Sequence, residues 1–175
     1  MNKLGFGFLR LPVKKGSPDD IDLDLLDHIL TKHPEVDLVQ LQINYLDWDS
    51  ASIQSRLCYE TARKHHKKII VMEPVKGGAL ASPPAEAVRL LRDLSPEESM
   101  ASFALRFAES LPEVEIVLSG MNTMAQLLDN LKERKPLIPE EQARLMQAAP
   151  RNFLSQTIFA GSANISITDQ ISLFH

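Results

Sequence analysis

The chain has 175 residues, of which 44% are hydrophobic and 24% are charged, and its net charge is −4. These values are typical of a globular protein with a substantial core and one principal domain. They do not favour a nucleic-acid partner, because the one basic cluster, Lys64–Lys68, is better explained as a helix end whose cations complement the helix dipole. No apolar run is long enough to cross a membrane, so we expect no membrane partner.

The single cysteine, Cys58, excludes an intrachain disulfide and suits a reducing compartment. The apolar N-terminus is interrupted by Arg10 and lacks a small-residue cleavage site, so we do not predict a signal peptide. We therefore predict a cytoplasmic protein. Sequence spacing places no histidine beside Cys58, and we expect this residue to be a buried helix thiol rather than a nucleophile. Trp48, Phe103 and Phe107 are expected to be packing residues.

Hydrophobic periodicity predicts alternating helices and strands along the chain. The predicted elements, in chain order, are a strand or hairpin arm at 4–12, a polar connector at 13–21, a helix at 22–33, a strand at 37–43, a helix ending near 65, a strand at 68–72, a loop at 73–84, helices at 85–94 and 97–111, a strand at 115–118, and helices at 123–133 and 139–148. The pattern fades after residue 149. Alternation of this kind predicts a parallel sheet with right-handed crossovers.

Capping residues mark several of the predicted helix starts. Asp49 or Ser50 is expected to cap the helix that ends near residue 65. The run Ser95–Glu98 matches a cap, a proline at the first helical position and a capping-box glutamate. Asn122 or Thr123 is expected to cap the helix at 123–133.

The most informative stretch is Ile69–Leu80, in which a buried strand runs directly into a Pro/Lys/Gly-Gly loop. In α/β proteins ligands bind at this end of the strands. The backbone N–H groups at Gly77 and Gly78, and those near Asn122, suit a phosphate. A lone Gly-Gly pair is equally the mark of an ordinary turn, and both interpretations stay open. The neighbouring His65 and His66 point in different directions on a helix and are not expected to bind a metal.

Four passages together resemble the aldo/keto reductase family, in the bacterial branch that carries a ferredoxin-like C-terminal extension. They are Leu4–Pro12, which resembles the opening hairpin, His33–Trp48, which resembles strand six, Val71–Gly78, which resembles strand seven and its loop, and Ser119–Asn130, which resembles strand eight and the following helix. The family fold is an eight-stranded barrel of about 250 residues. The resemblance therefore implies an α/β fold over residues 1–150: a partial (β/α) TIM barrel with about three parallel strands, flanking helices and a short N-terminal hairpin.

The same resemblance implies a site for NADP(H). Gln42 matches the residue that bonds the nicotinamide amide, the loop after residue 72 matches the pyrophosphate side, and the loop after residue 118 matches the adenosine side. The implied cofactor-binding residues are Gln42, Met72, Glu73, Pro74, Val75, Lys76, Gly77, Ser119, Gly120, Met121, Asn122, Gln126 and Asn130. Met72 stands where many relatives place an aromatic residue that stacks on nicotinamide.

Near residues 21–26 the sequence passes directly from the passage that resembles the opening hairpin to the segment before strand six, so the resemblance implies that strands one to five are absent. The family's catalytic Asp, Tyr, Lys and His lie on those strands. Tyr45 and Tyr59 are the only tyrosines, and neither lies in the catalytic context, so we assign no catalytic residue. The related branch ends in the ferredoxin spacing C-x2-C-x2-C-x3-C-P. Those positions fall here on Asn152, Ser155, Ile158, Ser162 and Ala163. Residues 151–175 are either a degenerate ferredoxin-like tail or unrelated to one, and we expect no iron–sulfur cluster.

Three functions are compatible with this sequence. The first is an aldo/keto reductase-like oxidoreductase chain that retains part of an NADP(H)-binding surface and has lost catalysis. The second is a non-catalytic interaction module, because a three-stranded sheet with open edges favours a homo-oligomer or a complementing barrel fragment. The third is an oxidoreductase whose proton donor comes from a partner.

Overall fold

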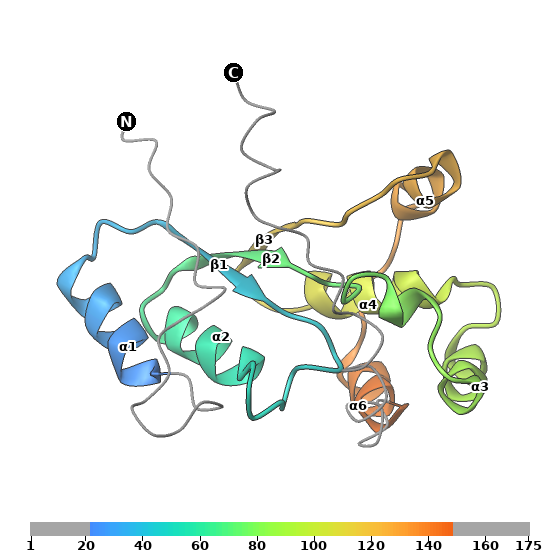
Figure 1. Cartoon of the computed structure of the whole chain (residues 1–175), viewed down its shortest axis with the longest axis horizontal. Coiled ribbons are helices and arrows are strands. Elements are labelled where there is room, and N and C mark those ends of the chain that lie inside the picture. Colours follow the sequence, from blue (N-terminus) through green and yellow to red (C-terminus); the bar gives the residue numbers. More distant parts are fainter. Residues whose placement is uncertain (1–21, 149–175) are drawn as a thin grey trace.

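A three-stranded parallel sheet forms the centre of the protein (Figure 1). The computed structural model describes residues 22–148; the hairpin arm predicted at 4–12, the connector at 13–21 and the tail after 149 lie outside the described residues. The strands are β1 (Leu38–Gln42), β2 (Lys68–Met72) and β3 (Val114–Val117), in the order β1-β2-β3. The predicted number and direction of the strands are therefore confirmed.

Six helices connect and flank the strands in the described part of the chain. Their bounds are α1 (Leu23–Lys32), α2 (Ser55–Lys64), α3 (Ala85–Leu94), α4 (Met100–Glu109), α5 (Met124–Asn130) and α6 (Pro139–Ala148), and a short 3₁₀ turn covers Ala79–Ala81. Each predicted helix is present. Thr123 caps α5 as one of the two predicted candidates, because its hydroxyl accepts the Gln126 N–H while the Gln126 side chain accepts the Thr123 N–H.

The predicted caps of α2 were wrong. This helix begins at Ser55, after Gln54, whose φ of 51° is left-handed. Asp49 instead holds the Arg56 side chain at 2.7 Å, and the Ser50 hydroxyl accepts the Ile53 N–H at 3.4 Å within the preceding turns. The segment between β1 and α2 buries Asp47 and is held in turns, because the Ser50 N–H donates to the Asp47 carbonyl and the Gln54 N–H to the Ser50 carbonyl.

The cap predicted for α4 was also wrong. Ser95 ends α3, since its N–H donates to the Leu91 carbonyl, and Ser99 caps α4 by accepting the Ser102 N–H. The physical reason lies at Glu98, whose carboxylate accepts from the Arg106 guanidinium at 2.9 Å and from the Ser102 hydroxyl at 2.6 Å. Arg106 is only 5% exposed, and its ion pair with Glu98 fixes Glu98 beside α4. Glu98 therefore precedes the cap residue Ser99 and is not part of the helix.

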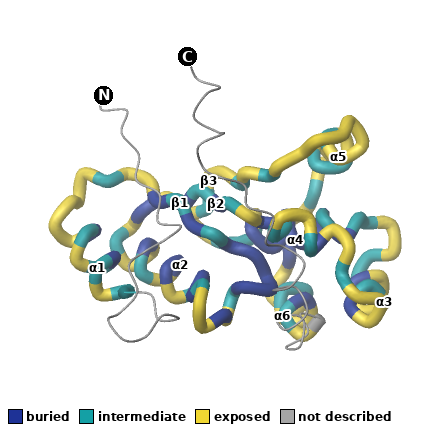
Figure 2. The backbone as a smooth tube through the Cα atoms, viewed as in Figure 1, coloured by how far each residue is buried: buried dark blue, intermediate teal, exposed yellow. Residues whose placement is uncertain are grey.

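Buried residues lie along β1, β2, α2 and α4 (Figure 2), and along the two strands they alternate with partly exposed ones. The face toward the helices carries the core of β1 and β2, with Val39, Leu41, Ile69 and Val71 all at most 2% exposed. Alternate residues of the same strands point to the other face and remain partly exposed. The predicted packing role of the aromatic residues is confirmed, because Trp48 lies 5.4 Å from the ring of Phe107 and Phe103 is fully buried.

The environment of Cys58 generates a direct prediction. The side chain is buried in α2, and burial raises its pKa from an ordinary 9.0 to about 11, since a thiolate there would lose its hydration. At pH 8 we expect iodoacetamide to alkylate the folded chain at least tenfold more slowly than the urea-unfolded chain, as followed by intact mass. Equal rates in the two states would contradict burial of the thiol.

Candidate functional site

The three segments implied to bind the cofactor meet at one end of the sheet. Gln42 and Met72 are the last residues of β1 and β2 and lie opposite each other in the parallel register. The Leu118 N–H donates to the Val71 carbonyl at 2.8 Å, so the loop that begins at Ser119 leaves from the same edge. Parallel strands place their carboxyl ends together, and the structure therefore collects loops that are far apart in the sequence.

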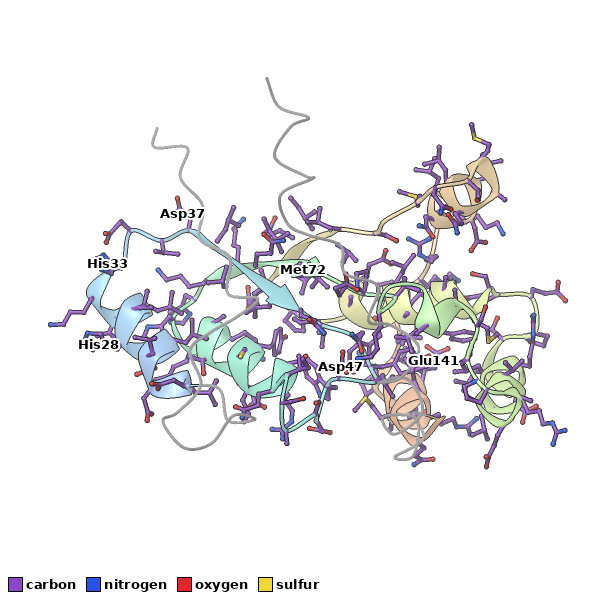
Figure 3. The ribbon with its side chains drawn as sticks, viewed as in Figure 1. His28, His33, Asp37, Asp47, Met72 and Glu141 are labelled. Atoms are coloured by element: carbon purple, nitrogen blue, oxygen red, sulfur yellow. The ribbon has the colours of Figure 1, made fainter. Side chains whose placement is uncertain are left out.

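A buried carboxylate, that of Asp47, holds the first two loops together (Figure 3). It accepts from the Gln42 side chain at 3.0 Å and from the Asn44 side chain at 2.9 Å. The Lys76 ammonium approaches its two oxygens at 2.6 and 2.7 Å. Asn44 also donates to the Glu73 carbonyl at 3.2 Å. These bonds join β1, the turn after it and the loop after β2 into one polar network, which we call the Asp47 network.

The loop after β2 has unusual backbone geometry. Glu73, Lys76, Gly77 and Gly78 all have positive φ angles, at 54°, 50°, 59° and 93°. Such angles cost free energy for residues with a Cβ, so the Asp47 network and the core must impose them. Pro74 is buried and Val75 packs against the core, so the first half of the loop is anchored and the glycines are exposed.

The backbone donors of this loop are already engaged. The Gly77 N–H donates to the Glu73 carboxylate at 2.7 Å. This carboxylate therefore lies where the sequence placed a phosphate, and an incoming anion would have to displace a group of its own charge. Both glycines are exposed, as a phosphate site would require, but the Glu73 side chain closes the turn that they form.

The loop after β3 is also closed on itself. The Gln126 side chain accepts the Asn122 N–H at 2.9 Å and the Thr123 N–H at 3.2 Å, which makes Gln126 a capping residue. Asn130 donates to the Ser119 hydroxyl at 3.1 Å across the base of the loop. Gly120 and Met121 lie exposed at its tip.

A small hollow opens beside this second loop. Its volume is about 150 Å³, and its lining combines apolar groups with a few polar ones. The lining residues are Leu105, Glu109, Val117, Ser119, Met121, Leu127, Asn130, Leu131 and Arg134. Ligand pockets usually enclose roughly 300–1,000 Å³, so this hollow has room for one ring of a dinucleotide. The implied residues Ser119, Met121 and Asn130 are thus brought together at one cavity.

The cations around the two loops are paired with carboxylates. Besides Lys76 with Asp47, Arg134 holds Glu109 at 2.8 Å and Lys132 holds Asp129 at 2.7 Å. The hydrogen bond from Lys132 and a second one from Ser99 lower the pKa of Asp129, which keeps this carboxylate charged. The residues present therefore fit the nicotinamide and adenosine ends of NADP(H) through amide groups, but they fit its phosphates poorly.

Neither tyrosine can act as an acid at this edge of the sheet. The Tyr59 hydroxyl, on α2, donates to the Pro112 carbonyl at 3.0 Å. Tyr45 is 3% exposed, lies edge-on to Phe107, and its pKa is raised by burial. Within residues 22–148 no group of three His, Cys, Asp or Glu side chains could hold a metal, and no helix there is long and apolar enough to cross a membrane.

Sequence reasoning missed Asn44 and Asp47. Both follow directly after β1, three residues apart, and a short polar pair in that position is a detectable signal for a turn that bonds to itself. The Asp47 N–H indeed donates to the Asn44 side chain at 2.8 Å. The partner Lys76 comes from another loop, and no local pattern in the sequence indicates that pairing.

The Asp47 network predicts an unequal response to removal of two lysines. Lys76→Met should destabilise the chain by about 3 kcal/mol, because it leaves the buried Asp47 carboxylate without its cation. Lys132→Met removes an exposed pair and should cost less than about 1 kcal/mol. Urea unfolding followed by the fluorescence of Trp48 measures both. Equal midpoints for the two variants would show that the buried pair is not important for stability.

Comparisons with known proteins were made for both sequence and structure. The model of the Aldo/keto reductase family matches residues 20–150. A search of curated proteins found no match. The fold is similar to that of aldo-keto reductase AKR11C1 from Bacillus halodurans in its holo form, with a TM-score of 0.55, 19% identity, and coverage of 71% of this chain and 47% of that chain. The apo form of that enzyme gives a TM-score of 0.51 at 18% identity, with coverage of 71% and 48%.

This chain therefore spans about half the length of the solved structures that it matches. At such identity the likeness establishes the fold, a partial (β/α) barrel. The match of the family model to residues 20–150 goes further, and the chain belongs to the aldo/keto reductase family.

Proposed function

We propose that this chain is an NADP(H)-binding part of an aldo/keto reductase barrel that does not reduce carbonyl compounds by itself. The observation that carries the proposal is the hollow of about 150 Å³ at the carboxyl end of β3, lined by Ser119, Met121 and Asn130. It lies at the same edge of the sheet as Gln42 and Met72. The buried free thiol of Cys58 supports a reducing compartment, the cytoplasm, for this function.

Each end of the cofactor has polar partners at this edge of the sheet. The Gln42 amide is held in place by Asp47 at 3.0 Å and can bond the nicotinamide amide without a large loss of side-chain entropy. The Asn130 amide and the Ser119 hydroxyl can bond an adenine ring in the hollow. When bound, NADPH supplies a hydride; this chain supplies binding and orientation.

Binding of the phosphates is opposed by the chain itself. The Glu73 carboxylate occupies the Gly77 N–H, and the Gln126 side chain occupies the N–H groups of Asn122 and Thr123. Lys76 is committed to Asp47. A dinucleotide must therefore compete with internal hydrogen bonds, which supports weak binding. Catalysis needs a proton donor beside the carbonyl carbon that accepts the hydride, and the side chains of both tyrosines are buried.

Titration calorimetry of NADPH into the full chain tests the proposal. We expect a dissociation constant of about 0.1 mM or weaker, because only part of the cofactor finds partners. Asn130→Leu should weaken binding further, whereas Gln147→Leu, which also replaces an amide by leucine but at an exposed site on α6, should leave it unchanged. No heat from the unmodified chain would remove the binding function, and NADPH consumption with a panel of aldehydes and ketones would overturn the claim of lost catalysis.

The position of Glu73 makes a second prediction. Glu73→Gln keeps an oxygen that can accept the Gly77 N–H but removes the negative charge next to the expected phosphate. NADPH affinity should rise about fivefold, since one unit charge at a distance of 4 Å is worth about 1 kcal/mol in water. Glu86→Gln, on an exposed face of α3, is the matched control. An unchanged affinity for Glu73→Gln would show that the phosphates do not approach this loop.

A further inference from the structure

Two exposed methionines lie in the loop after β3 and at the start of α5. Met121 and Met124 are 44% and 68% exposed. Among the other methionines in the described part of the chain, Met100 is 8% exposed, Met146 packs against the core, and Met72 is partly buried at the end of β2. An oxidant must reach the sulfur of a thioether to react with it, so the fold leaves Met121 and Met124 the most open to oxidation.

Met121 differs from Met124 in its surroundings. Met121 lines the hollow of about 150 Å³ beside the loop, together with the apolar side chains of Leu127 and Leu131. Met124 is the first residue of α5 and is not part of that lining. The two side chains are both exposed and only three residues apart, so Met124 is an internal control for any chemistry at Met121.

The hollow also contains hydrogen-bond donors that an oxidised Met121 can use. Asn130 donates to the Ser119 hydroxyl at 3.1 Å, and this bond uses one of the two amide hydrogens of Asn130 and leaves the hydroxyl its own proton. A thioether sulfur is only a weak acceptor for such donors. A sulfoxide is polar and carries an oxygen on the same sulfur. Oxidation therefore converts an apolar part of the lining into a hydrogen-bond acceptor in the same hollow as Ser119 and Asn130.

We propose that Met121 is a site of reversible oxidation by hydroperoxides, and that its sulfoxide occupies the hollow by accepting from the Ser119 hydroxyl and the Asn130 amide. A sulfur lone pair attacks one peroxide oxygen, and the O–O bond breaks as the S–O bond forms. The sulfur loses two electrons, and the second peroxide oxygen leaves as water or an alcohol after taking up the peroxide proton. Methionine sulfoxide reductases reverse the change, because two thiols become a disulfide and the sulfoxide oxygen leaves as water.

The thiol of Cys58 does not compete for the oxidant. It is buried in α2, and burial raises its pKa to about 11, so it carries little thiolate at neutral pH. The Asp47 network is built from carboxylate, amide and ammonium groups, which peroxide does not oxidise. Oxidation is therefore directed to the loop after β3 and the start of α5.

The consequence for NADPH rests on the proposed function. A sulfoxide that accepts from Asn130 competes with an adenine ring for the same amide and removes apolar area from the hollow. An adenine ring that enters the hollow must then desolvate a polar S=O group. Oxidation of Met121 thus makes the hollow a peroxide-sensitive part of the site.

Treatment of the full chain with hydrogen peroxide at neutral pH tests the modification without any cofactor. Peptide mass mapping should find one added oxygen at Met121 and Met124 about tenfold sooner than at Met100, whose side chain is buried. The Asn130 side-chain amide reports the new hydrogen bond in a proton–nitrogen correlation spectrum, where Asn130→Leu identifies its signals. These signals should shift on oxidation in Met124→Leu, the matched control, and stay in place in Met121→Leu.

Calorimetry with NADPH tests the consequence. The oxidised chain should bind about fivefold more weakly than the untreated chain, because the hollow has become polar. Met124→Leu should show the same loss on oxidation, whereas peroxide treatment should not change the affinity of Met121→Leu. Methionine sulfoxide reductases of both stereospecificities, with dithiothreitol, should restore the affinity of the oxidised chain.

Other results would overturn the inference. Oxidation of Met121 no faster than that of Met100, or unchanged Asn130 signals after oxidation, would show that Met121 is not such a site, whatever the affinity for NADPH. An equal loss of affinity in oxidised Met121→Leu would assign the effect to another residue. Absence of NADPH binding by the untreated chain would remove the proposed function alone, and the mapping and the Asn130 signals would still decide the inference.

Discussion

The buried carboxylate of Asp47 is the constraint on which the geometry of the site depends. An ionised carboxylate away from water is tolerated only when charged and polar donors surround it. Here the donors come from Gln42, Asn44 and Lys76, which belong to two different loops and one strand end. A shift of either loop would leave the charge uncompensated, so the ends of β1 and β2 are fixed relative to each other, and the positive φ angles at Glu73 and Lys76 are held in place.

Hydrogen bonds within the loops also limit what the site can bind. The backbone donors at Gly77, Asn122 and Thr123 are satisfied by Glu73 and Gln126 from the same loops. Internal satisfaction stabilises each loop in the absence of a ligand, but it removes the free donors that make a loop a good phosphate site. The amide of Asn130 and the hollow beside it impose no comparable charge penalty, so under the proposed function the hollow is the better-formed part of the site.

The sheet imposes a second constraint, which concerns area. Three strands with helices on one side bury Val39, Leu41, Ile69 and Val71 but leave the alternate residues without a cover. The core formed with α1, α2 and α4 is continuous, and it includes the aromatic contacts of Trp48 with Tyr59 and Phe107. The chain therefore has one complete interior, on the helix side, and the surface of a second one on the side where a full barrel has its central core.

The sequence alone determined the elements, the parallel sheet and the family resemblance, because hydrophobic periodicity and the strand-to-loop pattern at Ile69–Leu80 are local signals. It also placed the segments that the resemblance assigns to a cofactor at one edge of the sheet, since parallel strands end together. Only the tertiary structure decided how those residues are used. The pairing of Asp47 with Lys76 joins segments that are far apart in the sequence, and the start of α4 at Met100 follows from competition between caps, so neither has a local signature. The hydrogen bond from the Gly77 N–H to Glu73 spans only four residues, but it depends on positive φ angles that the surrounding structure imposes.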